Sequence, residues 1–200
     1  LRSWFVLVEK ENPRLREAGE HEKGEASMAE PNILLTRIDN RLIHGQVATQ
    51  WTSTIGANLI LVANDDVAAN KMRQKLMDMA APQGVATRYF SVQKTIDVIH
   101  KAAARQHIFL IVENPEDALR LVNGGVPIKK LNLGSMAHSV GKVVVTNALA
   151  MDQNDVDTLE KIKSKGVEFD IRKVPADKAE SYDAIIKKAE DELAAQADSK

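Results

Sequence analysis

The chain has 200 residues and a nearly balanced charge, with 27 Lys and Arg against 28 Asp and Glu. This length suffices for one domain of about 150 residues with its own core, plus terminal segments. The balanced charge argues against a nucleic-acid-binding protein and provides no acidic tail. The sequence contains no cysteine, which excludes disulfides, thiolate nucleophiles and cysteine-bound metals and is typical of a reducing compartment.

Neither a membrane span nor a signal peptide is indicated by the sequence. No apolar run reaches the roughly 18 residues that a transmembrane helix needs. The apolar residues 4–8 are followed at once by charged residues 9–11, so this segment is too short for the core of a signal peptide. We therefore expect a cytoplasmic protein.

The N-terminal segment differs in composition from the rest of the chain. Residues 9–27 carry many charges and almost no large apolar side chain after Leu15. Such a segment cannot bury enough surface to offset the entropy lost on ordering. We expect residues 1–27 to form a disordered extension and residues 28–200, which begin at Met28 like a natural start site, to form the domain.

From residue 32 onward, short β-rich runs alternate with helical patterns. The strand candidates are residues 33–36, 59–63, 85–90, 107–112 and 131–133. Several are continuous apolar runs, which suit strands buried on both faces of a parallel sheet. Helical patterns fill the intervals at residues 67–79, 91–104 and 115–123. This alternation predicts a single-domain α/β fold with an open, doubly wound, mostly parallel sheet and helices on both faces.

Helix-end signals support these boundaries. Asn114 is a typical N-cap, Pro115 suits the first helical position, and Gly124 suits the helix end. Asp65 or Asp66 is expected to cap the first helix, at residues 67–79, in the same way.

The last third of the chain continues the pattern. It predicts a strand at residues 142–147, a helix at 154–165 that stops at Gly166, a final strand at 167–171 and a C-terminal helix at 176–195. The polar, Lys- and Glu-rich composition of that last helix indicates a solvated face and docking on the edge of the sheet.

The richest candidate site is the sequence R-I-D-N-R-L-I-H-G-Q at residues 37–46, which follows the first strand. Open α/β sheets bind ligands beyond the carboxyl ends of their strands, where this segment is expected to lie. Arg37, Asp39, Arg41 and His44 can face one another or solvent there. The backbone N–H groups at Gly45 and just after it would open a helix, and helix N-termini attract anions.

A neutral imidazole beside guanidinium groups and a helix N-terminus suits attack on a phosphoryl group, with His44 becoming a phosphohistidine. A general base would need a nucleophilic side chain nearby, and the loop supplies none. A metal ligand would need companions, and the chain has neither H-x-H nor H-E-x-x-H. Spacing alone leaves one alternative open, namely a structural histidine that caps a helix or fills a polar niche.

A second candidate segment follows the fifth strand and should reach the same edge of the sheet. Gly134 permits close backbone approach, and Ser135 offers a hydroxyl group to a phosphate, although a plain turn is the alternative. His138 is a weaker candidate in this segment.

Two further readings find less support. Residues 64–66 (N-D-D) resemble the acidic pocket of a receiver domain, but the order of elements favours helix capping. The glycines form neither a G-x-G-x-x-G nor a Walker loop, so nucleotide binding has no support.

Residues 38–47, followed by Trp51, resemble the signature R-I/L-D-x-R-L-I/V-H-G-Q-V…W of a bacterial family. These are the IIB components of the mannose/sorbose/N-acetylgalactosamine class of the phosphoenolpyruvate-dependent sugar phosphotransferase system. The family's A-N-D-D/E-V-A and G-G-V-x…I/L-N-I/V-G-x-M stretches are also matched. The matching segments are residues 63–68, 124–127, 131–136, 166–168 and 174–175. The resemblance spans residues 31–185.

The resemblance implies that His44 accepts a phosphoryl group on Nδ1 from a separate, phosphorylated IIA protein and passes it to sugar at the membrane IIC and IID subunits. It makes Arg41 the first candidate for holding the phosphoryl oxygens and Arg37 the second, with Asp39 orienting the loop or an arginine. From the residues themselves, we expect the phosphate-binding positions to be Gly45, Gln46, Gly134 and Ser135. No cofactor, nucleotide or metal is implied on this subunit, which would associate peripherally with the inner face of the cell membrane.

The resemblance leaves the sugar open. The surroundings of the histidine loop and residues 52–59 resemble the amino-sugar branch (N-acetylgalactosamine or galactosamine) more than the mannose branch. Ser135 and His138 depart from the family's usual residues, so a role in sugar choice stays open, as does a homodimer. The rival hypothesis is a regulatory module whose Arg/His loop only binds a phosphorylated metabolite.

Overall fold

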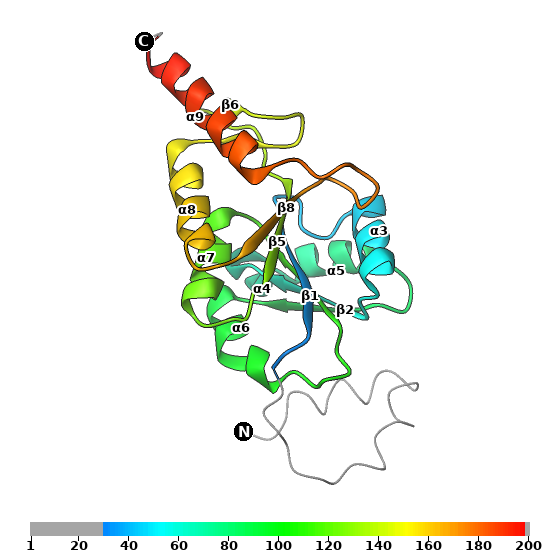
Figure 1. The fold of residues 1–200 in the computed structure, drawn as a ribbon. Helices are drawn as coiled ribbons and strands as arrows, with labels where there is room; N and C mark the ends of the chain where they lie inside the picture. Colours follow the sequence, from blue (N-terminus) through cyan, green and yellow to red (C-terminus); the bar gives the residue numbers. More distant parts are fainter. Residues whose placement is uncertain (1–29, 199–200) are drawn as a thin grey trace, which may run out of the picture.

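The computed structural model describes residues 30–198, so the extension expected at residues 1–27 lies outside the described part. A six-stranded sheet, parallel at every pairing, has the order β3-β2-β4-β1-β5-β8 (Figure 1). Its strands are β1 (Ile33–Asp39), β2 (Leu59–Ala63), β3 (Ala86–Phe90), β4 (Ile108–Val112), β5 (Lys130–Ser135) and β8 (Glu168–Ile171). The predicted doubly wound, parallel α/β fold is confirmed.

Helices cover both faces of this sheet. One layer holds α3 (Gly45–Ile55), α4 (Asp65–Ala69) and α5 (Lys71–Ala80), which enclose a core that includes Trp51 and Met77. The other layer holds α6 (Val92–Val98) with the 3₁₀ turn η1 (Ile99–Lys101), α7 (Pro115–Asn123), α8 (Gln153–Lys163) and α9 (Tyr182–Asp198). The central strands β2 and β4 are buried throughout because both cores pack against them.

The segment between β2 and β3 differs from the prediction. Instead of one helix over residues 67–79, two helices meet at Asn70, whose side chain accepts a hydrogen bond from Arg73 N. The cap of α4 is Asn64, which accepts from Val67 N, so the predicted caps at Asp65 or Asp66 are wrong. Asn outcompetes the neighbouring acids there because it stands at the last extended residue before the helix.

Two other elements differ from the prediction. The strand expected at residues 142–147 is only β6 (Val143–Val144), which pairs antiparallel with β7 (Ala150–Met151) outside the main sheet. The C-terminal helix begins at Tyr182 and not at residue 176. By contrast, α7 has the predicted bounds and the predicted cap at Asn114.

The first strand is longer than predicted, and this difference matters for the site. It runs through Asp39, so Arg37 and Asp39 belong to the strand and not to the following loop. Side chains two apart in a strand point to the same face, which directs both toward the α3 side. Buried Leu35, in the core beneath α3, shares this face.

In the strand order, the connection from β1 runs to β2 in one direction across the sheet, and the connection from β5 runs to β8 in the opposite direction. Because β1 and β5 are neighbours, their carboxyl ends flank a crevice of the kind in which open α/β sheets bind ligands. Asp39 pairs with Ser135 in the register at this edge. Among the described residues, no helix has the length and apolarity needed to cross a membrane.

Candidate phosphoryl-transfer site

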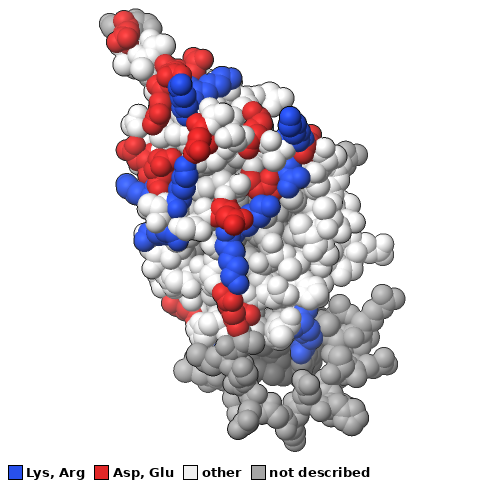
Figure 2. All heavy atoms as spheres, in the orientation of Figure 1, with Lys and Arg blue, Asp and Glu red and all other residues white. Residues whose placement is uncertain are grey.

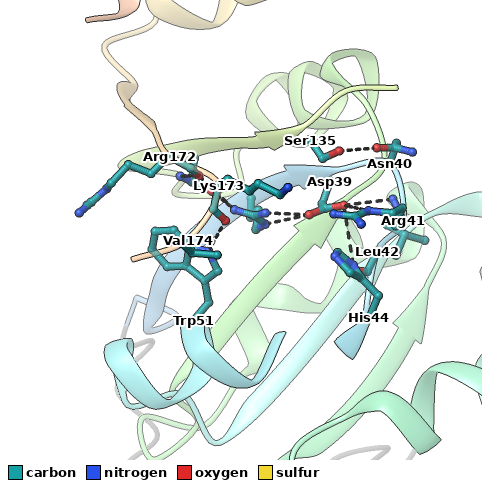
Figure 3. A network of polar contacts seen from close by, with 12 residues as sticks. Asp39, Asn40, Arg41, Leu42, His44, Trp51, Ser135, Arg172, Lys173 and Val174 are labelled. Carbon is teal, nitrogen blue, oxygen red and sulfur yellow. Dashed lines mark hydrogen bonds and ion pairs between the residues drawn. The ribbon is translucent and has the colours of Figure 1, made fainter. Parts of the chain in front are cut away.

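Asp39, the last residue of β1, organises the segment that follows it (Figure 3). Its side chain is fully buried. Oδ2 accepts hydrogen bonds from Arg37 Nε at 3.2 Å and Nη2 at 2.7 Å. Oδ1 accepts from the backbone N–H of Arg41 at 3.1 Å. One carboxylate therefore fixes both the buried arginine and the turn that leads to the histidine.

Arg37 lies inside the protein, with 1% of its side chain exposed. Its Nη1 donates to the Asn132 side chain and to Arg172 O. Burial lowers the pKa of the guanidinium, and the Asp39 carboxylate opposes this effect. Gly134 packs directly on the guanidinium, so a Cβ atom there would overlap it.

This placement does not fit the prediction that Arg37 holds phosphoryl oxygens. Its guanidinium bonds to protein groups beneath the loop, out of reach of an anion at the surface. Arg41 is placed differently: its side chain is 47% exposed, and its Nε lies 3.6 Å from Asp39 Oδ1. Of the two predicted arginines, Arg41 is the one with an exposed side chain.

His44 is the N-cap residue of α3, in extended backbone conformation, and its side chain makes no capping hydrogen bond. This geometry argues against the alternative of a helix-capping histidine. Nδ1 lies 2.9 Å from Leu42 O and 3.8 Å from Asp39 Oδ1. Nε2 is buried and has no hydrogen-bond partner among the described residues. Leu42 has φ +57°, a left-handed conformation that is costly for a leucine and turns its carbonyl toward the imidazole.

The β5 end contributes the other predicted residues. Ser135 Oγ donates to Asn40 Oδ1 at 2.8 Å, and Asn40 N donates to Ser135 O at 3.1 Å. An open pocket of about 400 Å³ adjoins this turn, and its lining includes Arg41, Ser135 and His138. The structure thus brings the predicted residues of both segments to one edge of the sheet. Gly45 opens α3 with φ +34°, and Gln46 follows in its first turn.

The sequence did not predict a second set of polar contacts beside the loop, which involves Trp51, Arg172 and the backbone of Lys173. Trp51 Nε1 donates to Lys173 O at 3.1 Å, and the guanidinium carbons of Arg37 and Arg172 lie 5.6 Å and 5.8 Å from its ring centroid. Arg172 also binds Asp170 through two hydrogen bonds of 2.8 and 2.9 Å. The available signal was the D-x-R spacing at the end of the last strand, where alternate residues share a face.

The face of the molecule drawn in Figure 2 has no dominant charge. Figure 2 shows acidic and basic side chains intermingled over β8, α8 and α9, and few charges over the face where α3 lies. Helix α3 itself carries no charged residue. Within residues 30–198, no group of three or more His, Asp or Glu side chains is arranged to hold a metal ion.

At the crevice of this open parallel sheet lie a histidine, an exposed arginine and a helix N-terminus that no side chain caps. This arrangement is suited to a protein that carries a phosphoryl group on histidine. Comparison with known proteins gives the family. Residues 33–197 match the family described as PTS system sorbose subfamily IIB component. The chain belongs to this family, the IIB components of the mannose class of the bacterial sugar phosphotransferase system.

Individual relatives agree with this assignment. The N-acetylgalactosamine-specific phosphotransferase enzyme IIB component 1 of Escherichia coli (strain K12) is 49% identical over 154 residues, covering 76% of this chain and 98% of that protein. The crystal structure of the E. coli N-acetylgalactosamine-specific IIB component 1 has a TM-score of 0.73 at 48% identity and covers 75% of this chain and 99% of its own. The IIBSor domain of the sorbose permease from Klebsiella pneumoniae has a TM-score of 0.74 at 36% identity, with 80% and 97% covered.

The protein is therefore a phosphotransferase-system enzyme IIB component, a phosphoryl carrier and sugar phosphotransferase. Membership implies interaction with the IIA and IIC/IID subunits of the same system. The structure adds the arrangement of the residues that can perform this work.

Proposed function

We propose that His44 is the phosphoryl-carrying residue and that Arg41 holds the phosphoryl oxygens. The observation that carries this proposal is the imidazole at the uncapped N-terminus of α3, beside the exposed Arg41 side chain. The guanidinium can bind two phosphoryl oxygens at once. The backbone N–H groups of Gly45 and Gln46 add the positive end of the helix dipole.

Two displacements at phosphorus make up the proposed cycle. In the first, a His44 nitrogen bonds to phosphorus while the bond to the IIA donor breaks, and its electron pair returns to IIA. In the second, a sugar hydroxyl oxygen bonds to phosphorus, the electron pair of the phosphorus–nitrogen bond returns to the imidazole, and the hydroxyl proton passes to the released ring. The protein's contribution to both steps is positioning and charge stabilisation.

The proposed acceptor atom is Nδ1, and this choice requires a movement of the ring. Nδ1 can donate to Leu42 O only while it carries the imidazole proton, and a protonated nitrogen is not a nucleophile. Before phosphorylation, the ring must leave this carbonyl and carry its proton on Nε2. Asp39 and Arg37 would act indirectly, by holding the turn from which the ring and Arg41 project.

The residues at the β5 end take positioning roles in this proposal. Gly134 leaves room for the Arg37 guanidinium, and Ser135 holds Asn40 at the start of the turn. The alternative, expected from the sequence, is that Gly134 or Ser135 contacts the phosphoryl group directly.

The proposed substrate is an amino sugar of the N-acetylgalactosamine type. Two E. coli relatives named N-acetylgalactosamine-specific IIB components are 46% and 49% identical to the chain, whereas the mannose-specific EIIAB component of the same strain is 42% identical. Hexoses such as mannose are the alternative, because the membrane subunits select the sugar. The proposed location is the inner face of the cell membrane, through IIC and IID.

The test is phosphorylation from phosphoenolpyruvate with the general phosphotransferase proteins and a cognate IIA. Wild type should acquire an acid-labile, base-stable label, and His44→Ala should acquire none. Arg41→Ala should slow transfer by about 100-fold, as expected for loss of one oxyanion-binding group. Arg41→Lys should recover only part of this rate because lysine cannot form the two-pronged contact.

His138→Ala, in the adjoining pocket, is the control and should be labelled at the wild-type rate. Equal labelling of His44→Ala and wild type would contradict the proposal. Binding of a phosphorylated metabolite by an unlabelled protein would favour the regulatory module instead.

A further inference from the structure

We infer that Lys173 is a second phosphoryl-binding cation, so that the phosphoryl group on His44 lies between Arg41 and Lys173. This inference rests on the proposed role of His44. Lys173 follows the last strand of the sheet and lies far from the histidine loop in sequence, yet both reach the same edge of the fold (Figure 3).

The backbone of Lys173 is held in place by buried groups. Trp51, on the second turn of α3, donates its indole N–H to Lys173 O at 3.1 Å. On the preceding residue, Arg172 is fixed by two hydrogen bonds to Asp170, whose side chain is 4% exposed. These bonds to Asp170 raise the pKa of the Arg172 guanidinium. Helix α3, whose N-cap residue is His44, therefore also anchors the segment that presents Lys173.

The side chain of Lys173 is directed at the site. Figure 3 shows it extending toward Asp39, from the side opposite Arg41. Lys173 and Arg41 both line the open pocket of about 400 Å³ beside the histidine loop. Lys173 also borders the neighbouring pocket, whose lining includes Asp177 and Glu180 but not Arg41. A compact anion in the pocket of about 400 Å³ would meet both Lys173 and Arg41.

The charges of the two arginines in this network are already balanced by protein groups. Arg37 is paired with Asp39, and Arg172 is paired with Asp170. The Lys173 ammonium has neither an ion pair nor a side-chain hydrogen bond within residues 30–198, and no carboxylate is among the described residues that line its pocket with Arg41. An ammonium group in this position is suited to a phosphoryl group, which carries about 1.5 to 2 negative charges at neutral pH.

The two cations therefore make different kinds of contact with the phosphoryl group on His44. Arg41 contributes a planar, two-pronged contact, and Lys173 contributes a mobile point charge that can follow the phosphoryl group between donor and acceptor. Both cations stabilise the charge that spreads over the phosphoryl oxygens during transfer.

The inference is tested with Lys173→Met and Lys173→Arg in the full chain. Lys178→Met is the matched control, because Lys178 is an exposed lysine of the same segment that borders the neighbouring pocket but not the one shared with Arg41. Single-turnover transfer from phosphorylated IIA to each variant is measured by rapid quench. Phosphorus NMR of the phosphorylated variants then gives the pKa of the phosphoryl oxygens.

Lys173→Met should slow transfer to His44 by about tenfold, a smaller loss than for a buried oxyanion contact because the lysine is exposed. It should also raise the pKa of the phosphoryl oxygens, since a neighbouring cation stabilises their ionised form. Lys173→Arg should restore most of the rate, and Lys178→Met should match wild type. The thermal midpoint should not change, because Trp51 binds only the backbone of residue 173.

Wild-type rate and an unchanged phosphoryl pKa in Lys173→Met would overturn the inference. So would a slow variant whose phosphoryl pKa is unchanged and which arginine does not rescue, because that pattern indicates a purely structural effect. Failure of the proposed function would look different, since wild type itself would then carry no label on His44.

Discussion

Arg37 and Asp39 show how two neighbouring charged residues can be buried at a site without contacting its ligand. Asp39 Oδ2 accepts two hydrogen bonds from Arg37, and Asp39 Oδ1 faces the backbone of Arg41 and the imidazole of His44. Burying two charges is costly unless they are paired and their remaining hydrogen-bonding groups are satisfied. Asn132 and the Arg172 carbonyl satisfy those of Arg37. The pair is a rigid support for the loop above it.

Gly134→Ala tests this support. A methyl group at position 134 would overlap the Arg37 guanidinium, which is buried and held by hydrogen bonds to Asp39 and Asn132. We expect a loss of about 2 kcal/mol in the free energy of unfolding from the forced repacking, together with slower phosphoryl transfer to His44. Urea unfolding and the labelling assay measure the two effects.

Gly124→Ala is the matched control for this substitution. Its methyl group would overlap the Ile96 side chain, away from the site. This variant should lose stability yet transfer phosphoryl groups at the wild-type rate once folded. Slowed transfer in both variants, or in neither, would contradict the support role of Arg37.

The hairpin β6–β7 and helix α8 illustrate how elements outside the main sheet are fixed to it. Asp152 and Asp155 form a capping box at the start of α8. Lys142, from the segment before β6, reaches the same box, with its Nζ 2.6 Å from Asp155 Oδ2. Burial raises the pKa of Asp155, and the bond to Lys142 counteracts this rise. The hairpin borders the pocket beside Asn40 and Arg41, and it is thereby tied to a helix of the layer opposite α3.

Lys142→Met should make stability depend more strongly on pH. A carboxyl whose pKa is raised in the folded state favours folding at low pH, and this contribution is lost as the pH rises through the folded pKa. Without Lys142 the pKa of Asp155 rises further. The variant should be about 1 to 2 kcal/mol less stable than wild type at pH 7.5. The difference should be smaller at pH 4, because the raised pKa of Asp155 leaves less of its carboxyl group ionised at the lower pH.

Urea unfolding at the two pH values provides the measurement. Lys129→Met, which removes an exposed ion pair with Glu30, is the control and should behave like wild type at both. A deficit of Lys142→Met that stays equal at pH 4 and pH 7.5 would show that the Asp155 charge is not its cause.

For the molecule as a whole, both helix layers and all six strands of the sheet lie within residues 30–198. The family match begins at residue 33, close to the start of β1. The strands of the sheet and the residues of both hydrophobic cores thus all come from the described part of the chain, residues 30–198.

A chain that starts at Met28 should therefore fold and carry phosphate like the full chain. Its thermal midpoint should agree to within about 2 °C, because the shorter chain keeps every residue of the two described cores. Differential scanning calorimetry and the labelling assay compare the two forms. A clearly lower midpoint, or a loss of labelling, would show that residues 1–27 belong to the working domain.

Several features were predictable because they depend on short-range patterns. Continuous apolar runs gave the buried strands, and Asn114 with Pro115 gave the start of α7. The length of β1 was not predictable in the same way. Arg37 and Asp39 are polar residues that read as a loop, yet pairing with β4 and β5 on either side extends the strand through them. Tertiary pairing outweighs local propensity at such positions.

By itself, the sequence determined the sheet class, the place of the loop at a strand end and His44 as its central candidate, because periodicity and spacing carry this information. Only the tertiary structure decided which arginine is exposed. Asn132 lies 95 residues from Arg37, and the Arg172 carbonyl lies 135 residues away, so nothing near Arg37 in the sequence reveals its partners. The same holds for Lys173, which reaches the site because β1, β5 and β8 are adjacent in the sheet and Trp51 holds the segment that follows β8.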